Sequence, residues 1–357
     1  MKALGKEYAL FISLISLVLF TLYEHTLTHT SMGNIIGFLV LFVVIIYASI
    51  SVAHHAELLA EKFGEPYGTL ILTMSAVTVE VMIIAIMMLH SHNPTLARDT
   101  IYSAIMLDIN GLLGISAIIG GLKFGEQPYN VDSSNSYLSM LLVAIGLSMV
   151  LPHFIDVAHH AMFLWFVVVI FTLLYLIFTK VQLKNHRYFF EYPTEESQPK
   201  QESHHHEKVN GWYHASLLLI YILLIGFLSE LLSVFMDNNL QELGLPLALG
   251  AVGVALISAS PELIVAIRAA LDNRMQTVIN IALGASLATV LLTVPSVIII
   301  SYIAGLSINL SITPIQGVLL GLTFLISIVN FNDGETNVLE GFLHFILFVA
   351  FAFVLFI

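Results

Sequence analysis

The chain contains no cysteine, and it contains few charged residues of either sign. Without cysteine it can form no disulfide bond, no thiolate metal site and no cysteine nucleophile. Only 10% of its 357 residues are Asp, Glu, Lys or Arg, whereas a soluble protein carries about 25%. The 12 basic side chains are outnumbered by 24 acidic ones, which leaves no basic surface for nucleic acid. These shortages exclude a soluble enzyme, a disordered protein and a nucleic-acid-binding protein.

The chain is rich instead in apolar residues, which make up 58% of it and give a mean hydropathy of +0.93. A membrane-spanning helix needs about 20 such residues in a row. Runs of this kind predict eleven transmembrane helices, at residues 8–24, 34–58, 66–89, 100–121, 136–152, 159–180, 212–234, 245–270, 276–303, 314–331 and 338–357. No small-residue cleavage site follows the first run, so we expect a retained span rather than a signal peptide. The sequence therefore predicts an all-α integral membrane protein surrounded by membrane lipid.

One long polar segment, residues 181–211, separates the helices into two groups. It is too polar to enter a bilayer, so it is predicted to be a linker. The chain then divides into an N-terminal transmembrane helix (1–33), a first five-helix half (34–180), the linker (181–211) and a second five-helix half (212–357). The three histidines at 204–206 in the linker could bind a metal or sense pH, or they could simply be solvated.

The basic residues predict the orientation of the chain, because cytoplasmic loops retain Lys and Arg. With the N-terminus inside and eleven helices, eleven of the 12 basic residues fall on the cytoplasmic side and only Arg98 falls outside. One helix more or fewer in the middle would destroy this asymmetry. We therefore expect a cytoplasmic N-terminus and an external C-terminus, in the inner (cytoplasmic) membrane of a bacterium.

Two carboxyl groups, Glu80 and Glu262, lie deep within predicted spans, where a charge costs about 2.5–3.5 kcal/mol on insertion scales. A shift of 182 residues places Glu80 on Glu262 and Thr78 on Ser260. The helices that carry the two acids run in opposite directions in the predicted topology. This predicts two inverted five-helix repeats plus one extra N-terminal helix, a transporter architecture with its site at the midplane. The alternative is that each acid is protonated or paired and only holds helices together.

Pro261 precedes Glu262 and removes one backbone donor, which predicts an unwound helix with free carbonyls near Ile257 and Ser258. Free carbonyls must face protein or a water-filled cavity in a membrane. Carboxylate, hydroxyl and carbonyl oxygens together suit a hard cation such as Ca2+.

The segments Ser-Ala-Ser-Pro-Glu (258–262) and Ala-Leu-Gly-Ala-Ser (282–286) resemble the second signature repeat of the calcium/cation antiporter superfamily. Three further segments resemble the first signature repeat of that superfamily: Gly-Glu-Pro-Tyr-Gly-Thr (64–69) with Glu80, Asp-Ile-Asn-Gly (108–111) and Ile-Ile-Gly-Gly-Leu-Lys (118–123). The chain is most similar to the bacterial calcium/proton exchanger branch, the Cha-type sodium/proton and calcium/proton antiporters. In architecture the resemblance covers the chain from about residue 34 onward.

The resemblance implies two pivotal carboxylates, here Glu80 and Glu262, with oxygen ligands one turn before each, where the chain has Ala76 and Ser258. The amide of the family's first repeat falls on or beside Asp108, with Asn110 two residues on. The corresponding polar position of the second repeat falls near Ala288, which has no side-chain oxygen. The ion- and proton-binding residues expected from the repeat and the resemblance are Glu80, Glu262, Asp108, Asn110, Thr78, Ser258, Ser260, Ser286 and Thr289.

Paired acids at low dielectric disfavour two simultaneous negative charges, and a bound cation reverses that preference by expelling protons. We therefore expect a secondary cation/proton antiporter with alternating access, not an enzyme. It would need no cofactor and would export Ca2+, or Na+ or K+, in exchange for H+. The oligomeric state is left open. Two other functions are considered: a cation channel, and a metalloenzyme built on His54, His55, His159 and His160.

Overall fold

The computed structural model of the chain describes residues 7–63, 67–182 and 210–356. Several features singled out in the sequence lie outside the described residues. They are Lys2, Lys6, residues 64–66 of the first signature segment, and nearly all of the linker with its histidines at 204–206.

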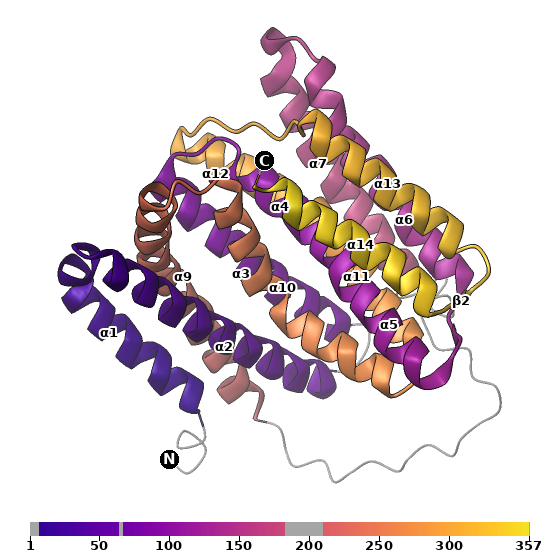
Figure 1. Cartoon of the computed structure of the whole chain (residues 1–357), viewed down its shortest axis with the longest axis horizontal. Helices are drawn as coiled ribbons and strands as arrows, with labels where there is room; N and C mark the ends of the chain where they lie inside the picture. Colours follow the sequence, from indigo (N-terminus) through magenta and orange to yellow (C-terminus); the bar gives the residue numbers. More distant parts are fainter. Residues whose placement is uncertain (1–6, 64–66, 183–209, 357) are drawn as a thin grey trace.

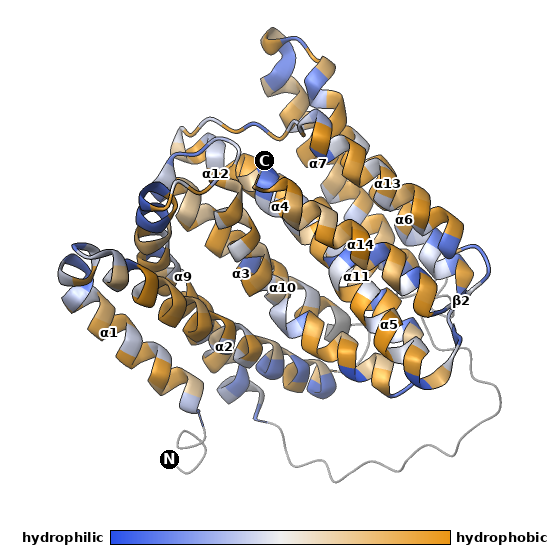
Figure 2. Ribbon diagram, viewed as in Figure 1, coloured by the Kyte–Doolittle hydropathy of each residue, from blue (hydrophilic) through white to orange (hydrophobic). Residues whose placement is uncertain are grey.

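All eleven predicted spans are found as helices, which confirms the predicted fold class (Figure 1). Among the described residues, nine spans are long and apolar enough to cross a membrane, and two more apolar helices of 17 residues follow. The unbroken helices are α1 (Tyr8–Thr28), α2 (Ser31–Phe63), α3 (Tyr67–Ser91), α7 (His160–Lys180), α9 (Gly211–Glu242), α10 (Ala248–Leu271), α13 (Pro314–Asn330) and α14 (Val338–Val354). Hydrophobic residues dominate these helices and hydrophilic residues gather toward many of their ends, as expected in a bilayer (Figure 2).

The remaining spans contain π-helical turns, in which the backbone hydrogen bonds reach one residue further than in an α-helix. These spans are α4 (Leu96–Met106), η2 (Leu107–Leu112) and α5 (Leu113–Phe124); α6 (Val131–Ile145), η3 (Gly146–Val150) and η4 (Leu151–Phe154); and α11 (Met275–Ala288), η7 (Thr289–Thr293) and α12 (Val294–Ala304). The π-helical turns η2 and η7 begin 182 residues apart, at Leu107 and Thr289. This is the offset that relates Glu80 to Glu262, so the two halves match in local backbone geometry as well as in sequence.

The first helices of the two halves, α2 and α9, form the most extensive helix pair of the molecule, and α1 lies against both. They have 33 and 32 residues. At about 1.5 Å per residue each is about 50 Å long, well beyond the hydrocarbon core of about 30 Å. The pair approaches closely at Gly37, where a Cβ atom would lie 2.6 Å from the Phe235 ring. This helix pair covers one side of α3 and α10 (Figure 1).

A short two-stranded antiparallel sheet joins the two halves at one end of the helices. Strand β1 (Gln127–Pro128) pairs antiparallel with β2 (Glu335–Thr336). The hydroxyl of Tyr129 donates to the carbonyls of Asn330 and Glu335, at 3.1 and 3.3 Å. Burial raises the pKa of Tyr129, so this phenol remains a neutral donor.

The unwinding predicted at Pro261 is wrong: α10 continues through it from Ala248 to Leu271. Proline removes the N–H that would bond to the Ile257 carbonyl. The hydroxyl of Ser260 donates to that carbonyl instead, at 2.8 Å. The side chain before the proline thus replaces the missing backbone donor, and the helix does not need to open.

Candidate ion-binding site

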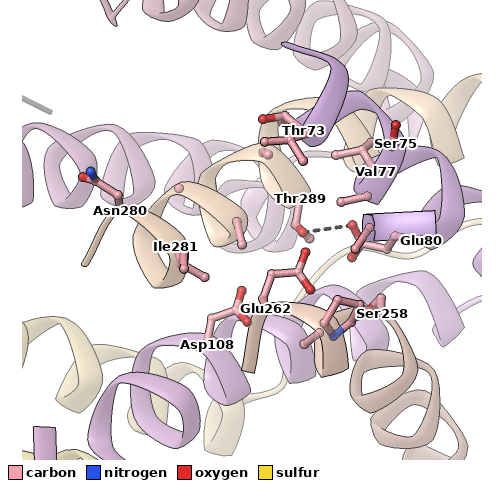
Figure 3. A pocket seen from close by; sticks show the side chains of 18 of the residues that line it. Thr73, Ser75, Val77, Glu80, Asp108, Ser258, Glu262, Asn280, Ile281 and Thr289 are labelled. Atoms are coloured by element: carbon pink, nitrogen blue, oxygen red, sulfur yellow. Dashed lines mark hydrogen bonds between the residues drawn. The ribbon is translucent and has the colours of Figure 1, made fainter. Parts of the chain in front are cut away.

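Three carboxyl groups from three helical segments share one place in the membrane interior. Glu80 comes from α3, Asp108 from the π-helical turn η2, and Glu262 from α10. In Figure 3 Glu262 lies between Asp108 and Glu80, and the three side chains extend toward the same space. Each acid is close enough to the other two to interact with them electrostatically. Two halves of opposite direction therefore bring acids that are far apart in sequence into one cluster.

The three acids differ in their hydrogen-bond donors. Glu80, only 4% exposed, accepts two hydrogen bonds at Oε2, from the hydroxyls of Thr289 and Thr293, both at 2.9 Å. Asp108, 2% exposed, accepts one at Oδ2, from the hydroxyl of Ser286 at 3.0 Å. All three donors come from the second half, on α11 and η7.

Each acid also keeps one buried oxygen with no hydrogen-bond partner among residues 7–63, 67–182 and 210–356: Oε1 of Glu80, Oδ1 of Asp108 and Oε2 of Glu262. None of the ion pairs among the described residues involves these three carboxyl groups. A buried carboxylate without a positive partner is costly unless a proton or a cation neutralises it. Three carboxyl oxygens of the cluster therefore have neither a hydrogen-bond donor nor a positive partner in the described part of the chain.

A cavity of about 650 Å³ contains all three acids. Its wall also includes Ser258 and Thr289, together with polar side chains that sequence reasoning did not single out for the site: Thr73, Ser75, Tyr137, Thr179, Gln182, Thr277 and Asn280. Both apolar and polar side chains line it, as in a path that water and ions can enter.

The cavity extends from the acids toward one end of the helix bundle. Its wall includes Glu57, Gln182 and Thr277. Glu57 lies near the end of α2, Gln182 lies just after α7, and Thr277 lies in the first turn of α11. This is the end that also carries Lys62 and Arg274. It is the end that the basic residues predict to be cytoplasmic.

At the opposite end, the connections of the two halves are tied together by Arg98 and Asp99. The Arg98 guanidinium bonds to Asp99 Oδ1 at 2.8 Å through one nitrogen and donates to the Ser311 carbonyl at 3.0 Å through another. The side chain of Gln316 donates to Asp99 at 2.9 Å. The one basic residue that was predicted to lie outside thus holds the first turn of α4 against the segment before α13. No residue of this tie lines the cavity.

Four of the predicted site residues beyond the two glutamates lie at or beside the cluster. Asp108, Ser258 and Thr289 line the cavity, and Ser286 bonds to Asp108. The other three, Thr78, Asn110 and Ser260, do not line it.

Those three residues share one feature: each is two positions from one of the acids. Residues two apart on a helix point in nearly opposite directions, so the partner of a cavity-facing acid must face away. Thr78 donates to the Met74 carbonyl at 2.6 Å, and Ser260 bonds to its own helix. Asn110 instead joins the turn to two other helices, through Thr323 at 2.8 Å and His344 at 3.1 Å.

Thr293 also bonds to Glu80, but it was not among the residues predicted for the site. It follows Thr289 by four residues, and residues with this spacing lie on one helical face. That spacing was the signal that could have identified it once Thr289 was chosen.

No three His, Asp or Glu side chains in the described segments are arranged so that they could hold a metal ion by themselves. The cluster would therefore need further oxygen ligands, from hydroxyls, carbonyls or water, to complete a shell of six to eight around Ca2+. The paired histidines of the alternative metalloenzyme do not meet either. His54 and His55 lie toward the end of α2, and His160 begins α7, at opposite ends of the bundle. His55 is 1% exposed and contacts His214 and Glu7 instead.

The sequence model of the family described as sodium/calcium exchanger protein matches residues 33–184 and 213–357. The chain is 31% identical to the sodium-potassium/proton antiporter ChaA of Escherichia coli (strain K12), over 99% of this chain and 98% of that relative. It is 26% identical to the Ca(2+)/H(+) antiporter ChaA of Bacillus subtilis (strain 168), over 64% and 66% of the two chains.

The fold is similar to that in the crystal structure of the selenium-substituted Ca2+/H+ antiporter protein YfkE, with a TM-score of 0.77 at 20% identity over 98% of both chains. The membrane spans, the inverted halves and the match over most of the chain agree with one another. The chain therefore belongs to the sodium/calcium exchanger family, and within it to the Cha-type branch of the calcium/cation antiporters, as a multi-pass membrane protein.

Proposed function

We propose that this protein exchanges a cation for protons across the bacterial cytoplasmic membrane, and that Glu80, Asp108 and Glu262 bind both. The observation that carries the proposal is that three buried carboxyl groups share one cavity without a basic partner. An empty cluster would hold up to three uncompensated negative charges in the membrane interior, which is strongly disfavoured. The protein would therefore switch between its inward-open and outward-open conformations only when the cluster carries a cation or protons. This requirement couples the cation flux to the proton flux.

Calcium is the cation that we favour, with export from the cell in exchange for H+. Carboxylate and hydroxyl oxygens are hard ligands that suit Ca2+. One Ca2+ on three carboxylates leaves one negative charge, which one proton can cancel, whereas Na+ would need two. The relatives are named for different ions, sodium and potassium in E. coli and calcium in B. subtilis, so Na+ and K+ are the alternatives.

The described conformation would be open to the cytoplasm, with the N-terminus inside. The wall of the cavity includes Thr277, at the end that carries most of the basic residues, and the other end is tied by Arg98. Because the chain has no cysteine, single cysteines can report accessibility without a background. Thr277→Cys should react with a membrane-impermeant thiol reagent only from the cytoplasmic side, and Asn309→Cys only from outside. The reverse pattern would contradict this orientation.

The central test uses the purified protein in vesicles with an acidic interior and a trapped fluorescent pH indicator. External Ca2+, Na+ or K+ is added one at a time, with the membrane potential clamped. The favoured ion should enter while protons leave, and the interior should become alkaline at a rate that saturates with cation concentration. Cation flux that does not respond to an opposing pH gradient would favour a channel, and no flux of any of the three ions would refute the proposal.

A further inference from the structure

Two threonines of one helical turn donate to the same oxygen atom of Glu80. Thr289 and Thr293 lie on η7, and both hydroxyls reach Oε2 at 2.9 Å. The other oxygen, Oε1, is buried and has no partner. One oxygen of this carboxyl group therefore has two donors and the other has none among the described residues (Figure 3 shows the contact of Thr289).

This use of hydroxyl groups is unusual within the molecule. Many of the other serines and threonines in the membrane spans donate to a backbone carbonyl four residues earlier, the common local bond of a helix. Examples are Ser75 to Ile71, Ser148 to Ala144, Thr172 to Val168 and Ser296 to Leu292. Thr289 and Thr293 instead donate across to another helix.

The arrangement is also confined to one half. The offset of 182 residues places Leu107 at the position of Thr289 and Gly111 at the position of Thr293. Neither has a hydroxyl, so Glu262 receives no matching pair from the first half. The sequence repeat alone therefore does not require the threonine pair.

We propose that Thr293 is a positioning residue, which together with Thr289 holds the Glu80 carboxyl group so that Oε1 meets the transported cation. This rests on the proposed function, since it concerns the same site. Thr289 lines the cavity and can also touch the cation itself, whereas Thr293 is fully buried and is not part of the cavity wall. Thr293 therefore acts on the cation only through Glu80, and it is the cleaner residue to change.

The test compares Thr293→Val with Thr293→Ser in full-length protein in vesicles. Valine keeps the shape and removes the hydroxyl, while serine keeps the hydroxyl. A hydrogen bond to a charged group is strong enough that its loss should raise the Ca2+ concentration for half-maximal exchange about tenfold. The maximal rate should change less than twofold, and serine should restore the wild-type value within about threefold. The matched control is Thr100→Val, which removes an equally buried hydroxyl that has no hydrogen-bond partner and should leave the half-saturating concentration unchanged.

A second measurement does not depend on transport. The melting temperature of the purified protein is followed as Ca2+ is added, and the Ca2+ concentration that gives half of the full increase is recorded. It should rise about tenfold in Thr293→Val as well. Half-saturation unchanged in both measurements, or serine as defective as valine, would overturn the inference. If the wild-type protein showed the shift with Ca2+ but no proton-coupled flux, the proposed function would fail, while the positioning role would still be decided by the melting curves.

Discussion

The two π-helical turns occupy matching places in the inverted halves but carry different chemistry. The turn in the first half, Leu107–Leu112, contains an acid of the cluster. The turn in the second half, Thr289–Thr293, contains two hydroxyls that bond to the acid of the other half. Inverted repetition therefore reproduces the backbone, and with it the location of the site, whereas the charge and the donors are distributed unequally. An inward-facing and an outward-facing site built in this way need not bind the cation with the same affinity.

Changes to the two matched glutamates, one from each half, should have the strongest effect on transport. Glu80→Gln and Glu262→Gln should each lower proton-coupled cation exchange in vesicles more than 100-fold, because each removes a charge that the cation and the protons both require. Glu57→Gln, at the mouth of the cavity, is the control and should retain most of the activity. Near-normal exchange by either cluster variant would mean that the halves do not contribute equally to coupling.

The next effect concerns the tie between the halves at the end opposite the cavity. Asp99→Asn should lower the free energy of unfolding in detergent by about 3 kcal/mol, since it leaves the nearly buried Arg98 without its charge partner. Asp272→Asn removes a similar but exposed pair with Arg274 and should cost less than about 0.5 kcal/mol. Chemical denaturation of both variants measures the difference. Equal values would mean that the tie does not hold the two halves together.

A smaller effect is expected for Asp108, which lies in the π-helical turn η2 and has no acidic counterpart in η7. Asp108→Asn keeps an oxygen that can accept from Ser286 and removes the negative charge. The Ca2+ concentration for half-maximal exchange should rise about tenfold, with coupling to protons retained, because the other two acids remain. If the variant instead lost coupling altogether, Asp108 would rank with the two glutamates as an essential proton carrier.

The smallest effect concerns the helices that carry the matched glutamates. Pro261 on α10 corresponds to Val79 on α3, and Ser260 corresponds to Thr78. Ser260→Ala should lower the free energy of unfolding by about 1 kcal/mol, because it leaves the Ile257 carbonyl without a donor. The cost should disappear when Pro261→Val is introduced as well, since valine restores the backbone N–H. Persistence of the cost in the double variant would show that the hydroxyl has another role.

The membrane spans predicted from the sequence are confirmed, and Glu80 and Glu262 both lie at the cavity where a midplane site was expected. Both predictions rest on large energies: apolar runs must enter the bilayer, and acids within them are too costly to be incidental. Thr78, Asn110 and Ser260 were also expected at the site but do not line the cavity, because nearness in sequence to an acid is not nearness in space. On a helix the direction of a side chain changes by about 100° per residue, so a residue two positions from a cavity-facing acid lies on nearly the opposite face.

Hydropathy and charge act over whole segments, so the sequence suffices to predict a membrane protein with eleven spans in two inverted halves. Which oxygens surround the site depends instead on how the helices pack. The donors to Glu80, Thr289 and Thr293, lie 209 and 213 residues further along the chain. No local pattern can specify such a contact, because it exists only once α3 and η7 lie against each other. The continuity of α10, by contrast, rests on a local bond, in which the Ser260 hydroxyl takes the place of the missing N–H three residues after the Ile257 carbonyl.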